Sequence, residues 1–308
     1  MIVRGLLLAV LVLTAGAAVW LYAPDRSRGA LEGAYHVRPE DYREVAGLRL
    51  FVRDEGPRGA PAVILLHGFG ASLQTWDGWA AALSRTHRVI RFDLPGFGLT
   101  GADTNGDYSD ARAMHLIAGL MDDLGVAKAS VVGNSLGGRI AWMFAAERPE
   151  RVNRLVLISP DGFASPGFQY GRAPDVPLLM RVLPYTMPRF LLRASLAPAY
   201  ADPGHLSEPV LTRYRDMMMA PGVRPAILER LRQSVLRDPI PLLRQIQAPT
   251  LLLWGKRDQM IPFGNSTDYL AAIPHATLVA LPNLGHVPFE EAPAESLAPV
   301  LPFLDGQG

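Results

Sequence analysis

A serine between two glycines, in Gly133-Asn134-Ser135-Leu136-Gly137, has the side chain and the spacing that nucleophilic chemistry requires. The apolar run 129–132 enters this stretch, and the helix-like run 139–148 leaves it. A strand, a sharp turn and a helix in this order are typical of a nucleophile elbow, which exposes the serine Oγ. Gly133 and Gly137 suit such a turn because glycine gives the backbone the freedom that it needs. An ordinary glycine-rich turn is the alternative for these five residues alone.

Two other residues that could take part in the same chemistry follow apolar runs in the last third of the chain. Asp258 follows the run 249–253, and His286 follows the run 276–281. The order along the chain is therefore Ser135, Asp258, His286. A further loop, residues 67–70, follows the run 62–66, and its glycines would let the backbone approach a reacting carbonyl group. A helix-capping turn is the alternative for that loop.

Alternating strands and helices must position these residues. The runs 62–66, 88–92, 129–132 and 152–159 are typical of buried strands, and the segments 76–83 and 109–124 are typical of helices. Residues 43–53 alternate imperfectly between apolar and polar and indicate a strand or a hairpin with a turn at Gly47. Strands that alternate with helices predict a parallel sheet that is covered on both faces.

The alternation of strands and helices is interrupted between residues 161 and 244. Prolines recur there, and short helix-like pieces lie between them at 178–183, 189–196, 208–219 and 224–236. This pattern indicates a helical cap at 161–244. We therefore divide the chain into an N-terminal segment (1–24), a linker (25–41), a core in two parts (42–160 and 245–308) and the cap.

The composition excludes several kinds of site. The chain has 308 residues with a net charge of +1 and no nucleic-acid-binding motif, so we expect no nucleic-acid partner. It has no cysteine, which excludes disulfides, thiolate metal sites and cysteine nucleophiles. A hydrophobic content of 49% is enough for one large core. We predict that the site holds neither a cofactor nor a metal.

The N-terminal segment is apolar from residue 5 to residue 23, apart from Thr14. A helix of this length, at about 1.5 Å per residue, would span roughly 28 Å, close to a hydrocarbon core. We expect a single-pass anchor that contacts membrane lipid, with the main domain on the periplasmic side. The alternatives are a signal peptide that is cleaved near the small residues 15–17, which would give a secreted protein, and a buried core helix.

Five motifs together resemble those of the α/β-hydrolase fold superfamily, over roughly residues 42–304. They are His67-Gly68-Phe69-Gly70, Asp93-Leu94-Pro95-Gly96-Phe97-Gly98, Gly133-Asn134-Ser135-Leu136-Gly137-Gly138, Trp254-Gly255-Lys256-Arg257-Asp258 and Gly285-His286. Each follows an apolar run, and their order matches the superfamily. The resemblance implies an α/β fold with a mostly parallel twisted sheet, helices on both faces and a helical cap insertion.

The resemblance also implies a role for each candidate residue. Ser135 would be the nucleophile, His286 would take its proton and return it to the leaving group, and Asp258 would hold the imidazole in the right tautomer. Asp161 is the alternative acid, because some members of the superfamily carry the acid after the preceding strand. Asp93 precedes Ser135 and is expected to be structural.

The oxyanion hole would be formed by backbone N–H groups of the two loops around the serine. The resemblance assigns these donors to Phe69 and Leu136, and it assigns the shaping of the loops to Gly68, Gly133 and Gly137.

The reaction that these residues favour is ester hydrolysis. Members that are haloalkane dehalogenases or epoxide hydrolases use aspartate where Ser135 stands, which argues against both activities. We expect a carboxylesterase or lipase that acts through an acyl-enzyme on a hydrophobic carboxylic ester. A carbon–carbon bond hydrolase of meta-cleavage products is the alternative, because such members often carry Gly-Asn-Ser as at 133–135. They also often carry Trp after the histidine, where this chain has Val287. A catalytically silent binding module is the third possibility.

Overall fold

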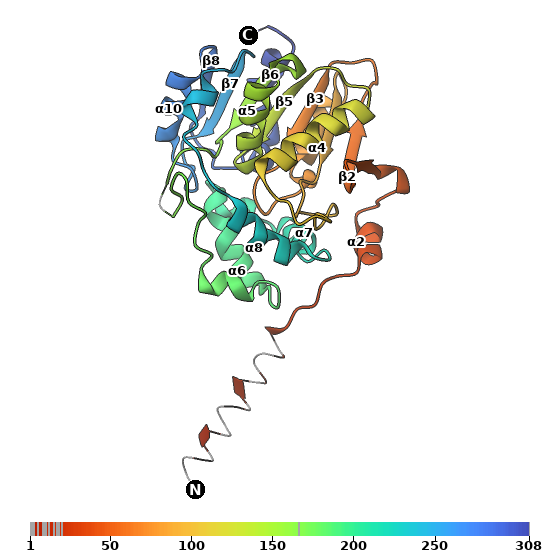
Figure 1. Cartoon of the computed structure of the whole chain (residues 1–308), viewed down its shortest axis with the longest axis vertical. Coiled ribbons are helices and arrows are strands. Elements are labelled where there is room, and N and C mark those ends of the chain that lie inside the picture. Colours follow the sequence, from red (N-terminus) through yellow and green to blue (C-terminus); the bar gives the residue numbers. More distant parts are fainter. Residues whose placement is uncertain are drawn as a thin grey trace.

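A sheet covered by helices on both faces forms the body of the molecule (Figure 1). The computed structural model describes residues 21–165 and 167–307, together with residues 4, 6, 7, 11, 13, 14, 16 and 19. Within these residues the sheet has 8 strands in the order β1-β2-β4-β3-β5-β6-β7-β8. The pairs β1–β2 and β2–β4 are antiparallel, and the other neighbouring strands are parallel. The predicted mostly parallel α/β sheet is confirmed.

The strands coincide with the apolar runs of the sequence. They are β1 (Tyr42–Val45), β2 (Leu48–Glu55), β3 (Ala62–Leu66), β4 (Arg88–Phe92), β5 (Ala129–Asn134), β6 (Val152–Ile158), β7 (Thr250–Gly255) and β8 (Ala276–Leu281). Every residue of β3, β4, β5 and β7 is buried, as expected for strands with both faces covered. The predicted hairpin is present as β1 and β2. Ala46 and Gly47 join them with φ values of 47° and 77°, which suit a two-residue hairpin turn.

Two hydrophobic clusters lie on opposite faces of the sheet. One contains Ile64 and Leu66 of β3 with residues of α4 (Asp110–Asp123), α5 (Leu136–Glu147) and α10 (Ser266–Ala272). The other contains Val63 and Leu65 with residues of α3 (Asp77–Leu83), α11 (Pro288–Glu291), α12 (Pro293–Leu297) and α13 (Val300–Leu304). Successive side chains of a strand point to opposite faces, so β3 supplies both clusters.

A helical insertion, residues 161–244, separates β6 from β7. It contains the short 3-10 helices η4 (Leu178–Val182), η5 (Ala197–Ala199) and η6 (Pro203–His205) and the α-helices α6 (Arg189–Leu196), α7 (Glu208–Met218), α8 (Val223–Gln233) and α9 (Ile240–Leu243). Figure 1 shows α6, α7 and α8 gathered together, below the sheet in this view. Its role as a cap stays a prediction.

Residues 22–35, the N-terminal strap, lie against this insertion. Tyr22 forms an isolated β-bridge with Thr186, and Arg26 N donates to Met219 O at 2.9 Å. The strap ends in α2 (Arg28–Ala34), whose Leu31 is completely buried. Residues of the predicted linker (25–41) therefore pack against the rest of the chain, as Arg26 and Leu31 do.

The predicted membrane localisation requires correction. A spanning helix needs about 20 predominantly apolar residues. Among the residues that the structure describes, no helix is long and apolar enough to cross a membrane. Much of segment 1–24, on which the predicted anchor falls, lies outside the described residues. This finding contradicts the predicted single-pass localisation with its periplasmic domain, and it does not support the expected contact with membrane lipid.

Candidate active site

Ser135 occupies a strained turn between β5 and α5. Its φ of 53° and ψ of −118° are unusual for a residue with a side chain. Ser135 N donates to Ile158 O at 3.1 Å, and Ser135 O accepts from Arg139 N at 2.9 Å and Asp161 N at 3.0 Å. These bonds hold both peptide groups of the serine. Strain of this kind persists only where the surrounding structure enforces it, and it is typical of functional sites.

The glycines around the serine have no room for a side chain. A Cβ on Gly133 would lie 2.3 Å from Gly137 O, and a Cβ on Gly137 would lie 2.3 Å from Leu66 O. A Cβ on Gly68 would lie 2.9 Å from Asn134 Oδ1 and 3.4 Å from Ser135 Cβ. The first two contacts are with backbone, which cannot easily move away. Gly68 places the loop after β3 directly beside Ser135.

His286 and Asp258 lie side by side after β8 and β7. His286 Nδ1 is 2.8 Å from Asp258 Oδ2, and both side chains are buried. Asp258 Oδ1 accepts hydrogen bonds from Met260 N at 2.8 Å and Ile261 N at 2.9 Å. A carboxylate bonded in this way keeps the Nδ1 proton on the imidazole, so Nε2 is the nitrogen that can accept another proton.

Asn134 joins the histidine loop to the elbow. Its Nδ2 donates to His286 O at 2.9 Å and to Ile158 O at 3.1 Å. On the other side, His286 N donates to Ala199 O of the helical insertion at 2.8 Å. The bond from Asn134, the residue next to Ser135, brings the His286–Asp258 pair to the elbow. In the sequence, Asn134 stood out only as part of the elbow motif.

The two other candidate aspartates, Asp161 and Asp93, have different partners. Asp161 is 3.0 Å from Arg139 Nη1, in an ion pair. Asp93 is completely buried and accepts from Leu73 N and Leu99 N, both at 2.7 Å. Burial raises the pKa of Asp93 to about 7. These contacts are structural, and the imidazole of His286 has its carboxylate partner in Asp258.

The loop after β3 contains a buried neutral histidine. His67 Nε2 accepts from Leu94 N at 2.9 Å, so Nδ1 carries the proton and donates to Gly68 O at 2.8 Å. Burial lowers the pKa of His67 to about 4. The Phe69 ring lies edge-to-face against Phe97 at 5.5 Å. His67 therefore fixes the backbone from which the Phe69 N–H projects.

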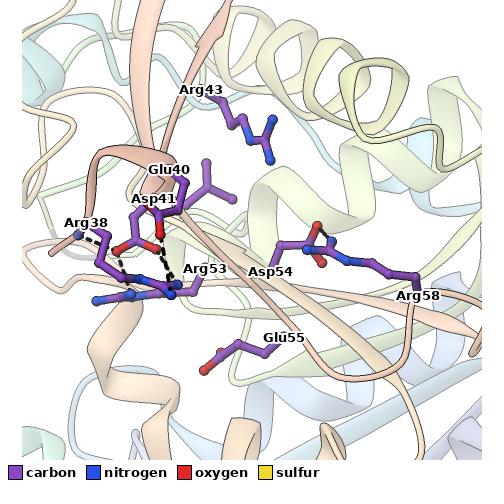
Figure 2. Close-up of a pocket in the computed structure, with 9 residues that line it drawn as sticks. Arg38, Glu40, Asp41, Arg43, Arg53, Asp54, Glu55 and Arg58 are labelled. Atoms are coloured by element: carbon purple, nitrogen blue, oxygen red, sulfur yellow. Dashed lines mark hydrogen bonds and ion pairs between the residues drawn. The ribbon is translucent and has the colours of Figure 1, made fainter.

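A pocket lined by many charged side chains lies at another part of the molecule, beside β1 and β2. Its cavity volume is about 190 Å³. Figure 2 shows the side chains that line it. It is lined by four arginines, four acids and a valine: Arg38, Glu40, Asp41, Arg43, Val52, Arg53, Asp54, Glu55 and Arg58. Opposite charges pair there, as Arg53 does with Asp41 at 2.6 Å. Among the residues described in the structure, no group of three or more His, Asp or Glu side chains could hold a metal ion.

Comparisons with known proteins agree with this fold. The model of the α/β-hydrolase fold family matches residues 61–293. The 2-hydroxy-6-oxo-6-phenylhexa-2,4-dienoate hydrolase of Burkholderia cepacia is 30% identical over 260 residues, 79% of this chain and 86% of that protein. The 2-hydroxymuconate semialdehyde hydrolase of Pseudomonas putida is 31% identical over 80% of this chain and 88% of that protein.

Two solved structures are similar over most of their length. A membrane phospholipase A has a TM-score of 0.74 at 28% identity and covers 99% of this chain and 98% of its own. The enol-lactonase of Burkholderia xenovorans LB400 has a TM-score of 0.73 at 27% identity and covers 86% and 99%. The family model spans most of the sequence, and it includes the elbow, the aspartate loop and the histidine loop. This chain therefore belongs to the α/β-hydrolase fold family.

Proposed function

We propose that this hydrolase acts through Ser135, His286 and Asp258 and forms an acyl-enzyme. The observation that carries the proposal is the 2.8 Å contact between His286 Nδ1 and Asp258 Oδ2, in a loop that Asn134 ties to the strained elbow. His286 Nε2 takes the proton of Ser135 as Oγ attacks the substrate carbonyl, and it then protonates the leaving group. Water then attacks the carbonyl of the acyl-enzyme, with His286 as the base. The carboxylic acid product is released, and Ser135 regains its proton from His286.

The negative oxygen of the tetrahedral intermediate needs hydrogen-bond donors. We assign them to the backbone N–H groups of Phe69 and Leu136. Gly68 lies beside Ser135, and Leu136 begins α5, whose N-terminal dipole favours negative charge. Losing one such donor typically costs about 3 kcal/mol of transition-state stabilisation.

We propose a carboxylic ester with a hydrophobic acyl or alcohol group as the substrate. Two structural relatives support this choice, because a phospholipase A and an enol-lactonase both act on carboxylic esters. The phospholipase also matches nearly the full length of the chain. The helical insertion would act as a cap over the site, since its Ala199 O accepts the N–H groups of both His286 and Val287.

A second candidate is the hydrolysis of a carbon–carbon bond in meta-cleavage products. The curated relatives from Burkholderia cepacia and Pseudomonas putida favour it. Gly133-Asn134-Ser135 agrees with that group, whereas Val287 after the histidine departs from it.

A substrate panel on the full chain separates these functions. It contains p-nitrophenyl esters of increasing acyl length, a phospholipid with two acyl esters and a vinylogous diketone of the ring-cleavage type, with Ser135→Ala as the blank. We expect the esters to be turned over and Ser135→Ala to lose activity by a factor on the order of 10⁵–10⁶. Faster turnover of the diketone than of every ester would favour the second candidate. If the chain fails to react with any substrate or with a fluorophosphonate probe, it is a silent binding module.

A further inference from the structure

A second buried carboxylate, Glu291, lies behind the histidine loop. It is the last residue of α11, and its side chain is 1% exposed. Oε2 accepts hydrogen bonds from Gly285 N at 2.8 Å and from Ala201 N at 3.2 Å, and Oε1 accepts from Asp202 N at 3.0 Å. Three backbone N–H groups from two distant loops thus converge on one side chain.

The three donors belong to the loop that carries His286 and to the part of the helical insertion that touches it. Gly285 directly precedes His286, and Ala201 and Asp202 follow η5 of the insertion. The two loops approach so closely that a Cβ on Gly285 would lie 2.6 Å from Ala201 N. Backbone N–H groups that face each other across such a contact need an acceptor between them, and the Glu291 carboxylate provides it.

Three polar atoms of His286 make hydrogen bonds within the protein. Its N donates to Ala199 O, its O accepts from Asn134, and its Nδ1 donates to Asp258. Nε2 is the remaining polar atom. The position of Nε2 relative to Ser135 therefore depends on the backbone of residues 285–286, which Glu291 anchors.

We propose that Glu291 is a positioning residue, which fixes the backbone of the histidine loop against the insertion and thereby aligns His286 Nε2 with Ser135. The proposal rests on the proposed function of Ser135 and His286. A charged acceptor suits this position because hydrogen bonds to a carboxylate are about twice as strong as those between neutral groups. Glu291 lies behind the loop and acts through it.

The neighbouring acid offers a matched control. Glu290 accepts from the Tyr214 hydroxyl at 2.8 Å and pairs with Arg213, both on α7. Its side chain is only 7% exposed, and it bonds to side chains of the insertion rather than to N–H groups of the histidine loop. The change of Glu290 to Gln therefore alters the charge next to the insertion and leaves the three backbone bonds in place.

The test compares Glu291→Gln and Glu290→Gln in the full chain. We expect Glu291→Gln to lower kcat about 10- to 100-fold with little change in KM, because a displacement of about 1 Å at a reacting group can cost a hundredfold. The downfield NMR resonance of the His286–Asp258 proton should shift or broaden in Glu291→Gln and stay in Glu290→Gln. An unchanged kcat and resonance in folded Glu291→Gln would overturn the proposal, as would equal effects in both variants.

Glu291→Asp keeps the proposal testable if Glu291→Gln does not fold. This variant retains the charge but cannot reach all three N–H groups with its shorter side chain, so kcat should fall and the rate of labelling of Ser135 by a fluorophosphonate should fall with it. Wild-type kcat and labelling in Glu291→Asp would contradict the proposal. Full activity in Ser135→Ala would instead refute the proposed function, and the NMR resonance would still report on the histidine loop.

Discussion

Asp258 and Asp161 follow neighbouring strands but have different partners. Asp258 lies 2.8 Å from His286, whereas Asp161 pairs with Arg139. We expect Asp258→Asn to lower kcat by about 10⁴-fold, because an amide favours the wrong imidazole tautomer, and Asp161→Asn to lower it far less. Steady-state turnover of the best ester checks both variants, with circular dichroism as the control for folding. The opposite ranking would transfer the role of the acid to Asp161.

His67 makes the stability of the fold depend on pH. Its folded pKa of about 4 lies below the unfolded value of about 6.5, so the unfolded chain binds more protons between these limits. The stability that His67 contributes is therefore present above pH 6.5 and is lost as the pH falls towards 4. From pH 7 to pH 5 the contribution of this residue should fall by about 2 kcal/mol.

The variant His67→Gln checks this prediction. Glutamine can still accept from Leu94 N, and it does not titrate in this range. Urea unfolding at pH 7 and pH 5 should show a smaller loss of stability on acidification in His67→Gln than in the wild type. Equal losses in the two proteins would mean that other groups carry the acid sensitivity.

At the scale of elements, the elbow is where sequence and structure agree most closely. The Gly-x-Ser-x-Gly pattern predicted a strand, a turn and a helix, and β5, Ser135 and α5 follow in that order. The strands, the hairpin at Gly47 and the helix at 109–124 could be predicted because burial and period leave a local pattern. The 3-10 geometry of η4 and the early end of α8 at residue 233 could not.

The long-range hydrogen bonds around the histidine loop leave no local pattern in the sequence. Asn134 reaches His286 O across 152 residues, and Glu291 reaches Ala201 N across 90. Such contacts depend on how the loops lie in space, which neither propensity nor period encodes. The chain order Ser135, Asp258, His286 was informative because it matches that of the superfamily, and the parallel strands β7 and β8 place the loops of Asp258 and His286 side by side.

The elbow also gives a prediction about packing. In Gly133→Ala the new Cβ would lie 2.3 Å from Gly137 O, so the strand and the helix would have to separate. We expect a loss of about 3 kcal/mol or more in the free energy of unfolding, and slower labelling of Ser135 by a fluorophosphonate. Gly59→Ala is the control, because no atom lies within 4 Å of its new Cβ. A Gly133→Ala variant as stable and as reactive as Gly59→Ala would show that the elbow can relax.

At the scale of the whole molecule, two ion pairs join the N-terminal strap to the helical insertion. Asp25 of the strap is 2.6 Å from Arg224 of α8, whose side chain is 1% exposed, and Arg26 is 2.5 Å from Asp216 of α7, whose side chain is 8% exposed. Arg224 Nε and Nη1 have no hydrogen-bond partner in the part of the chain that the structure describes. These two buried charges of the insertion, Arg224 and Asp216, therefore rely on the strap, which makes the strap part of the folded unit.

Removing one of these partners should destabilise the molecule. Asp25→Ala leaves Arg224 buried without its carboxylate, and we expect the free energy of unfolding to fall by about 1–3 kcal/mol. The loss should be smaller than for a fully buried pair, because Asp25 is 38% exposed and partly screened by solvent. Urea unfolding at constant pH measures it. Asp175→Ala is the matched control, because its pair with Arg172 is exposed on both sides and its loss should change little.

A second change separates the ion pair from other effects of the substitution at residue 25. If the unpaired charge of Arg224 causes the loss, Arg224→Met should recover part of the stability of Asp25→Ala, because no buried charge then remains without a partner. The two changes would be far from additive. Additive losses, or an Asp25→Ala variant as stable as Asp175→Ala, would show that α8 keeps its place without the strap, and that residues 22–35 lie on the insertion without supporting it.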